Sequence, residues 1–341
     1  MRTRAVLTLL ALGAIGLAGL RSPAPTAGPA ATKSDKSDVT TYQAVVAGLR
    51  AGEPYYEVLG FELRRLGYPT RDAFNWRTPL LLRAVSAVPD AVGRGALLAF
   101  LVVLSCATLA AVRQPFTVVW TAAAQQLAVL AVSVVAPDTV SVVAGEAWAG
   151  VLVGVSVCAY ALRRTTFAVA LGLLALFVRE LAAPYCVVCT IIAASNRRWR
   201  ELAAWIGGAC VYAVYYGWHL TQVWAHRLPT DLAHSSSWLE FGGLRSLQAT
   251  IHWMGWWLVF PAPLTTLALV LIVGGIANAR APLHVRAASA TYAVFFLVAG
   301  KPFNDYWGMI AGPTWALACG YGVQTMYQAM KAAFAPLRSS E

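Results

Sequence analysis

Ten apolar segments, separated by short polar stretches, constrain this sequence more than any other feature. Hydrophobic residues make up 59% of the chain and charged residues only 12%, about half the share of a typical soluble domain. A helix needs roughly 20 apolar residues to cross a hydrocarbon core about 30 Å thick. We therefore expect one domain spanning 1–341, all-α and polytopic, with about ten transmembrane helices. The apolar segments lie at 5–20, 93–112, 116–136, 142–162, 164–178, 182–196, 203–222, 259–278, 287–300 and 309–328.

The charges between these segments predict the orientation. One set of loops and both termini carry only two acids, Glu201 and Glu341, among twelve basic residues. Short loops rich in Lys and Arg face the cytoplasm, so this side is predicted to be inside. The first segment then reads as a retained signal anchor, with a cleaved signal peptide as the alternative. The outer face receives a long first loop (21–92), a second loop (223–258) and three short tips (137–141, 179–181 and 301–308).

The long first loop carries the signals of three short helices. Asp38 is a favoured N-cap residue, and Gly52 is a favoured stop, for a helix with an apolar face that we expect to lie along the membrane surface. A second helix is expected over 55–66. A third begins with Thr78 as its cap and Pro79 at its first position. The loop is thus predicted to be a set of interfacial helices.

Three acids of this loop are candidates for proton transfer. Asp38 is either a simple helix cap or a general base, and a cap would hold such a base in place. Glu53 and Glu57 are rivals that otherwise read as solvated loop acids. Tyr55 and Tyr56 either line a binding site or belong to an interfacial aromatic belt.

Charged residues at the ends of apolar segments are further candidates. Arg77 reads either as a snorkelling side chain or as a bidentate phosphate ligand. Arg179 and Glu180 lie between two apolar segments, where charge is costly and indicates function unless the pair is a water-exposed tip. Glu146 is the main charge inside an interior segment.

A polar cluster at 300–308 contains Lys301, Asn304, Tyr306 and Trp307. Lysine can neutralise a phosphate leaving group, and aromatic rings can stack on a ligand. The plainer interpretation is an aromatic loop at the membrane boundary.

Metal and nucleic-acid sites are not predicted. Cys186 and Cys189 form a CxxC, but no second pair or histidine accompanies them, so two small buried residues are the favoured interpretation over a redox or metal pair. His219 and His226 are too loosely spaced to indicate a metal site. No glycine-rich phosphate loop or zinc-finger spacing occurs, so no nucleic-acid partner is expected.

Four stretches of the chain stand out together: "DVTTYQAVVAGLRAGEPYY", "GYPTRDAFNWRTPLL", "RELAAPY" and "NDYWGMIAGP". They resemble the GT-C superfamily of integral-membrane glycosyltransferases, in its bacterial branches that use polyprenyl-phosphate sugars and are mannosyltransferase-like or arabinosyltransferase-like.

The resemblance implies an inverting hexosyl or pentosyl transferase of the cytoplasmic (inner) membrane, with its active site outside. It implies a polyprenyl-phosphate sugar donor, a glycan or glycolipid acceptor and contact with membrane lipid. No cofactor is required, and a divalent cation is compatible. Asp38 matches the catalytic acid of the first loop by position, while Glu53 and Glu57 stay open as alternatives. The residues expected to bind substrate are Tyr42, Tyr55, Tyr56, Glu57, Arg77, Arg179, Glu180, Lys301, Asn304, Tyr306 and Trp307.

Two other classes of function compete with this interpretation. A flippase or transporter of lipid-linked glycans predicts charges buried in the middle of several membrane helices, and the interior segments hold few. A non-catalytic membrane partner subunit explains interfacial helices, but it does not explain why Asp38, Arg179 and Lys301 are all expected on the outer face.

Overall fold

The computed structural model describes residues 2–21, 38–111, 142–233, 240–254, 264–299 and 302–334. Every regular element in these ranges is a helix, which confirms the predicted all-α class. The 3₁₀ helices are η1 (Ala73–Asn75), η2 (Glu180–Ala182) and η5 (Pro302–Trp307). The α-helices are α1 (Arg2–Arg21), α2 (Asp38–Arg50), α3 (Tyr55–Arg65), α4 (Pro79–Ser86), α5 (Asp90–Ala111), α7 (Gly145–Ala161), α8 (Thr165–Val178), α9 (Ala183–Ser195), α10 (Trp199–Ala225), α11 (Gly243–His252), α12 (Thr265–Ala277), α13 (Leu283–Val298) and α14 (Gly308–Ala333).

Two of the described helices are long and apolar enough to cross a bilayer, judged by length and composition. They are Thr3–Arg21 in α1 and Asp90–Thr108 in α5. Each predicted apolar segment with described residues contains a helix, whereas 116–136 lies outside the described part of the chain. Helix length and composition thus support an all-helical protein with several apolar helices. Two of the described helices, and not ten, meet the length and composition needed to cross a bilayer. The shorter apolar helices are Gly145–Ala161, Thr165–Val178, Glu180–Ser195, Thr265–Ala277 and Leu283–Val298.

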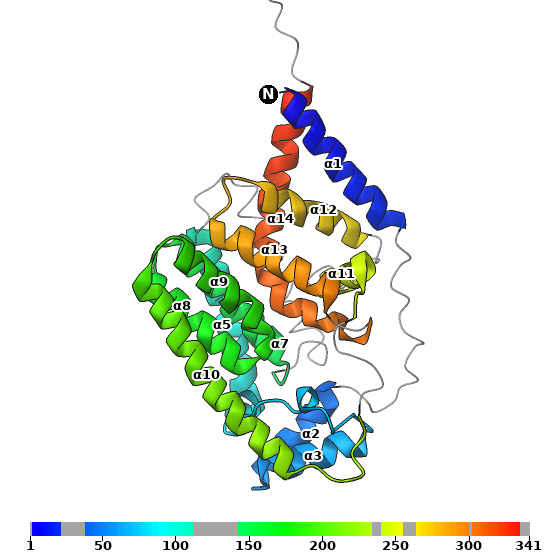
Figure 1. Cartoon of the computed structure of the whole chain (residues 1–341), viewed down its shortest axis with the longest axis vertical. Helices are drawn as coiled ribbons and strands as arrows, with labels where there is room; N and C mark the ends of the chain where they lie inside the picture. Colours follow the sequence, from blue (N-terminus) through cyan, green and yellow to red (C-terminus); the bar gives the residue numbers. More distant parts are fainter. Residues whose placement is uncertain are drawn as a thin grey trace, which may run out of the picture.

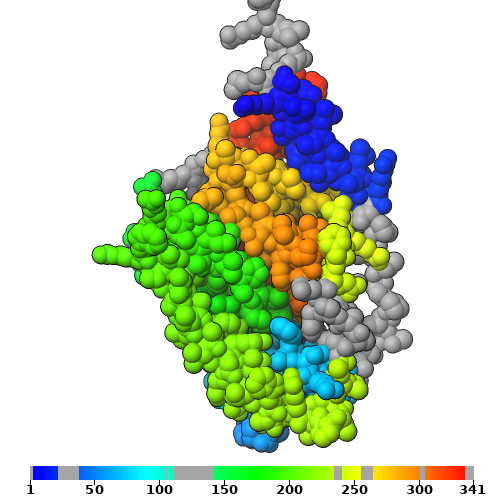
Figure 2. All heavy atoms as spheres, in the orientation of Figure 1, coloured from blue at the N-terminus to red at the C-terminus, as the bar shows by residue number. Residues whose placement is uncertain are grey.

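The helices form two neighbouring groups with a small helical cap at one end. Figure 1 shows α7–α10 beside α11–α14, with α2 and α3 at one end and α1 with the last turns of α14 at the other. Figure 2 shows all heavy atoms in the same orientation, with α1 again at the end opposite the cap. Helix α7 lies at the centre and packs against α5, α8 and α14. Val153 and Val157 of α7 are fully buried in this core. The cap of α2, α3 and α4 therefore covers one end of the main bundle.

The helices of the cap begin and end where local signals predicted. Helix α2 begins at Asp38, and Gly52 follows it with a φ of +88°, a conformation that favours glycine. Helix α4 begins at Pro79 after an extended Thr78. One expectation needs correction. The apolar face of α2 does not lie bare along a membrane surface, because Val45 and Val46 pack into a core shared with α3 and α4.

A salt bridge joins the cap to the end of α10. Arg64 of α3 donates from Nε to Asp231 Oδ1 at 2.6 Å and from Nη2 to Oδ2 at 3.1 Å. The Leu228 N–H also donates to this carboxylate at 2.9 Å. The Arg64 hydrogen bond is the main reason why the pKa of Asp231 falls to about 2. The ion pair is bidentate and well enclosed, so it stabilises more than an ordinary surface pair.

Asp231→Asn is expected to lower the free energy of unfolding at neutral pH by about 2 kcal/mol. A lowered folded-state pKa contributes stability above the unfolded pKa of about 3.9, and that contribution disappears as the pH falls through about 2. Thermal unfolding in detergent measures the effect. Glu62→Gln is the control, since its pair with the half-exposed Arg65 is an i,i+3 surface contact worth about 0.5 kcal/mol. Equal losses in the two variants would contradict this assignment.

Helices α12 and α14 approach each other through glycines. A Cβ on Gly322 would collide with the backbone carbonyl of Leu271, and one on Gly275 with that of Ala318. Close backbone contact through small residues is a usual means of packing apolar helices.

Gly322→Ala is therefore expected to destabilise the fold by about 1–3 kcal/mol, because a backbone carbonyl cannot move aside as a side chain can. Gly217→Ala in α10 is the matched control: its added Cβ meets no atom within 4 Å. The control should be neutral or slightly stabilising, because alanine favours helix over glycine. Thermal unfolding of the two variants side by side tests the contact, and similar melting temperatures would refute it.

Candidate functional site

Arg179 occupies a break between two helices. Helix α8 ends at Val178, Arg179 is extended (φ −153°, ψ 121°), and η2 precedes α9. Pro184 lies in the first turn of α9, where its missing N–H costs no intrahelical hydrogen bond. The Arg179 side chain is only 2% exposed. The pair Arg179–Glu180 is thus not a water-exposed tip: its arginine points into the protein.

The buried arginine is neutralised from another helix. Arg179 Nε lies 2.7 Å from Glu146 Oε1, in the first turn of α7, and Arg179 also pairs with Glu180. Arg77 approaches the same acids at 3.4 Å (Glu146) and 3.8 Å (Glu180). We call Asp38, Arg77, Glu146, Arg179 and Glu180 the charged cluster. Burial of this much charge requires pairing of this kind, so the cluster holds four separate chain segments together.

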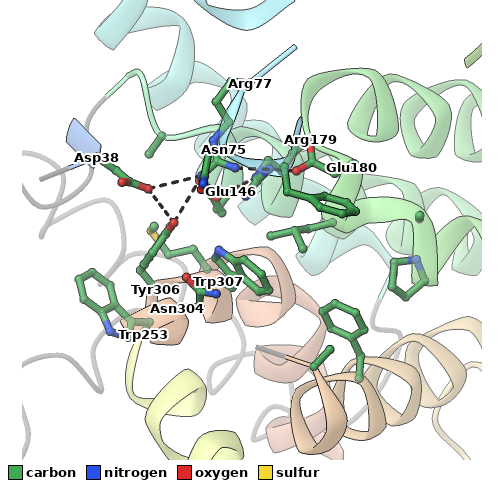
Figure 3. Close-up of a pocket in the computed structure, with 18 of the residues that line it drawn as sticks. Asp38, Asn75, Arg77, Glu146, Arg179, Glu180, Trp253, Asn304, Tyr306 and Trp307 are labelled. Atoms are coloured by element: carbon green, nitrogen blue, oxygen red, sulfur yellow. Dashed lines mark hydrogen bonds and ion pairs between the residues drawn. The ribbon is translucent and has the colours of Figure 1, made fainter. Parts of the chain in front are cut away.

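Asp38 closes the cluster on the side of the cap. Its Oδ1 accepts a hydrogen bond from the Tyr68 hydroxyl at 2.8 Å, and its Oδ2 accepts one from the Tyr306 hydroxyl at 2.7 Å. Arg77 Nη2 lies 3.4 Å from the same Oδ2. Figure 3 shows the contacts of Tyr306 and Arg77 converging on the carboxylate from different segments. The carboxylate is 29% exposed, so its orientation is set while part of it stays open to a ligand.

Tyr68 and Tyr306 act as hydrogen-bond donors to Asp38. Burial, and next the negative charge of Asp38, raise the pKa of both Tyr68 and Tyr306 above the usual value. Both phenols therefore remain protonated at neutral pH and keep donating to the carboxylate. Tyr42 and Tyr55 hold Arg77 in turn: its guanidinium lies 5.4 Å from the Tyr42 ring centroid, and its carbonyl accepts from the Tyr55 hydroxyl at 2.7 Å.

The charged cluster forms one end of a large pocket of about 1810 Å³. Away from the charged cluster, the pocket is lined by apolar side chains of α9 and α13. Several of these, including Val187 and Val294, are also well exposed on the molecular surface. The pocket therefore continues from a charged end into an apolar groove that opens between two helices. The apolar lining residues of α9 and α13 are Ala183, Pro184, Val187, Val188, Ile191, Val294, Phe295 and Val298.

Most of the residues expected from the sequence lie at this pocket. They come from the cap, the α8–α9 break and η5, which are far apart in the chain. Figure 3 shows how several of them face one another across the cavity. The expected residues that line the pocket are Asp38, Tyr42, Arg77, Arg179, Glu180, Asn304, Tyr306 and Trp307.

The other expected residues do not line it. Tyr55 and Tyr56 are buried behind the wall, where the Tyr56 hydroxyl lies 2.9 Å from His219 Nδ1. Glu53 and Glu57 are exposed on the surface of the cap. Lys301 lies outside the described residues. Among the three candidate bases of the first loop, Asp38 is the one that lines the cavity; Asp72 of the same loop lines it as well.

Several pocket residues were not assigned to the site from the sequence, among them Glu146, Tyr68, Asp72 and Asn75. Glu146 was noted only as an interior charge, although its place at the predicted outer end of a segment was an available signal. Tyr68 and Asn75 carried no such signal, because ordinary polar loop residues resemble them.

No group of three or more His, Cys, Asp or Glu side chains that could hold a metal ion occurs in the described ranges.

Charge and shape together define what the pocket suits. An anionic group can contact Arg77 and Arg179, a hydroxyl can donate to Asp38, and an aliphatic chain can occupy the groove between α9 and α13.

Comparisons of the chain with protein-family models, with curated proteins and with solved structures found no match.

Proposed function

We propose that this protein is an inverting glycosyltransferase of the GT-C type. It transfers a hexose or pentose from a polyprenyl-phosphate carrier to a glycan or glycolipid of the cell envelope. It spans the cytoplasmic membrane about ten times, counting the shorter apolar helices, and its pocket faces outward. A lipid-linked donor suits an outer site, because the carrier itself brings the sugar to the membrane surface. The proposal requires no cofactor, and a divalent cation is compatible with it.

One observation carries the proposal: a single pocket joins a cluster of carboxylates and arginines to an apolar groove open at the side of the molecule. A polyprenyl-phosphate sugar has the same two-part character. Its chain would lie between α9 and α13 and leave through the opening near Val187 and Val294. Its phosphate would meet Arg179 and Arg77 where the groove reaches the charged cluster.

The chemistry then follows from the position of Asp38. The carboxylate takes the proton of an acceptor hydroxyl as that oxygen forms a bond to the anomeric carbon. The bond from the anomeric carbon to the phosphate oxygen breaks, and its electron pair leaves with polyprenyl phosphate. Arg179 and Arg77 stabilise the negative charge on this leaving group. Attack from the face opposite the phosphate inverts the anomeric centre.

A flippase fits the cluster less well. Glu146 lies in the first turn of α7 and Arg179 lies between α8 and α9, so both charges are at helix ends. A path for a charged head group across the membrane would require polar groups along the middle of the helices.

The test is transfer by the purified protein in lipid nanodiscs. Polyprenyl-phosphate donors carrying different radiolabelled sugars are incubated with envelope glycans, with and without EDTA. We expect labelled product together with one equivalent of polyprenyl phosphate, and product of inverted anomeric configuration by NMR. Movement of the labelled donor between leaflets without cleavage would support a flippase instead and would reject the proposed reaction.

A further inference from the structure

Asn304 is a buried polar side chain of the pocket that the charged cluster does not use. It is 5% exposed, it lines the cavity, and its Nδ2 has no hydrogen-bond partner in the described structure. Asn75, on another part of the wall, differs because its Nδ2 donates to the Pro69 carbonyl at 2.6 Å. Buried amides are usually satisfied, so an amide without a partner beside a cavity indicates a ligand atom. Rotation about χ2 exchanges the two ends of an amide, so the donor can be presented to the cavity.

The position of this amide relates it to the proposed base. Asn304 belongs to η5, and Tyr306 of the same short helix donates to Asp38 Oδ2 at 2.7 Å. Trp307, about one turn further along, lines the same wall. Figure 3 shows Asn304 and Trp307 next to each other, on the wall facing Arg77 and Arg179. A group bound between a phosphate at Arg179 and an acceptor at Asp38 would therefore rest on Asn304 and Trp307.

The charge of the lining restricts what this group can be. The described lining contains the carboxylates Asp38, Asp72, Glu146 and Glu180, against two guanidinium groups. Both guanidiniums already contact acids of the cluster. A second anionic group on the ligand would meet like charges without a free cation among these residues.

We propose that Asn304 and Trp307 form the subsite for the transferred sugar, and that this sugar carries no acidic group. The inference rests on the proposed function. The Asn304 amide donates to one oxygen of the sugar ring or its hydroxyls, and the indole of Trp307 covers an apolar face of the ring. Asn304 and Trp307 of η5 thus determine the sugar specificity, from the wall opposite the arginines that hold the phosphate.

The experiment compares wild type, Asn304→Ala and the nearly isosteric Asn304→Leu in the nanodisc assay. The donors are the best neutral polyprenyl-phosphate sugar, its set of monodeoxy analogues and the corresponding uronic-acid donor. We expect both variants to lose about tenfold in kcat/KM with the complete sugar. With the one analogue that lacks the contacted hydroxyl, the loss should shrink to about twofold or less. The uronic-acid donor should be at least about 100-fold poorer than the neutral one for wild type.

The outcomes separate the two proposals. An equal loss in kcat/KM across all deoxy donors, or no loss at all, overturns the Asn304 subsite while leaving the transferase intact. Efficient use of the uronic-acid donor overturns the charge argument in the same way. A wild-type protein that transfers no sugar from any donor rejects the proposed function, and this subsite with it. Thermal unfolding of the variants checks the fold, which should change little because the Asn304 Nδ2 has no hydrogen bond to lose.

Discussion

Asp38→Asn is expected to lower the rate of sugar transfer by about 10²–10⁴-fold, the usual contribution of a positioned general base. Asparagine keeps the shape of the side chain and can still accept from one of the tyrosines, but it cannot take a proton from the acceptor hydroxyl. Binding of the donor should change much less than kcat, because the proposed sites for the phosphate and the lipid chain lie elsewhere in the pocket. Single-turnover assays with saturating donor measure the chemical step directly.

Asp90→Asn is the matched control for this variant. Like Asp38, Asp90 lies in the first turn of a helix and belongs to the 21–92 stretch. It differs in that it pairs with Arg50 on the surface, and its side chain is 60% exposed. The control should retain transfer, since a helix-end acid on the surface has no part in the chemistry. Transfer by Asp38→Asn at the wild-type rate would remove Asp38 from the mechanism. A loss on Glu57→Gln of the size expected for Asp38 would move the base to the surface of the cap.

Arg179→Met is expected to destabilise the protein by about 3–5 kcal/mol and to abolish detectable transfer. Its removal leaves the carboxylate of Glu146 buried, with only the longer 3.4 Å contact to Arg77. It also removes the arginine that we propose binds the donor phosphate where the groove reaches the charged cluster. Thermal unfolding in detergent and the nanodisc assay measure the two effects separately.

The double variant Arg179→Met with Glu146→Gln distinguishes these two roles. Removing both charges eliminates the unpaired carboxylate, so most of the lost stability should return. Transfer should not return, since the phosphate still lacks its arginine. If the double variant is as unstable as Arg179→Met alone, an unpaired Glu146 carboxylate is not the cause of the lost stability. Full recovery of transfer would exclude Arg179 from phosphate binding.

Much of the architecture could be predicted from the sequence, because it depends on local or repetitive signals. Apolar segments predicted the helices, and Asp38, Gly52 and Pro79 marked helix ends that the structure places at the same positions. The asymmetry of Lys and Arg grouped 21–92, 179–181 and 301–308 on one predicted side of the membrane. Residues of these three stretches do meet at the pocket. Side-chain periodicity and charge counting suffice for such statements, because each depends on neighbours in the chain.

Which of these residues meet, and in what geometry, was decided only by the tertiary structure. Asp38 and Tyr306 are 268 positions apart, yet one hydrogen bond of 2.7 Å joins them. Glu57 follows Tyr56 directly, but helix α3 turns the acid outward and buries the tyrosine against His219. Arg179 finds Glu146 on another helix, a pairing that hydropathy does not encode. The sequence by itself determined a helical, apolar protein with its chemistry-bearing residues near helix ends. The packing of helices distant in the chain decided which acid faces the cavity, since contact depends on three-dimensional distance and not on separation along the chain.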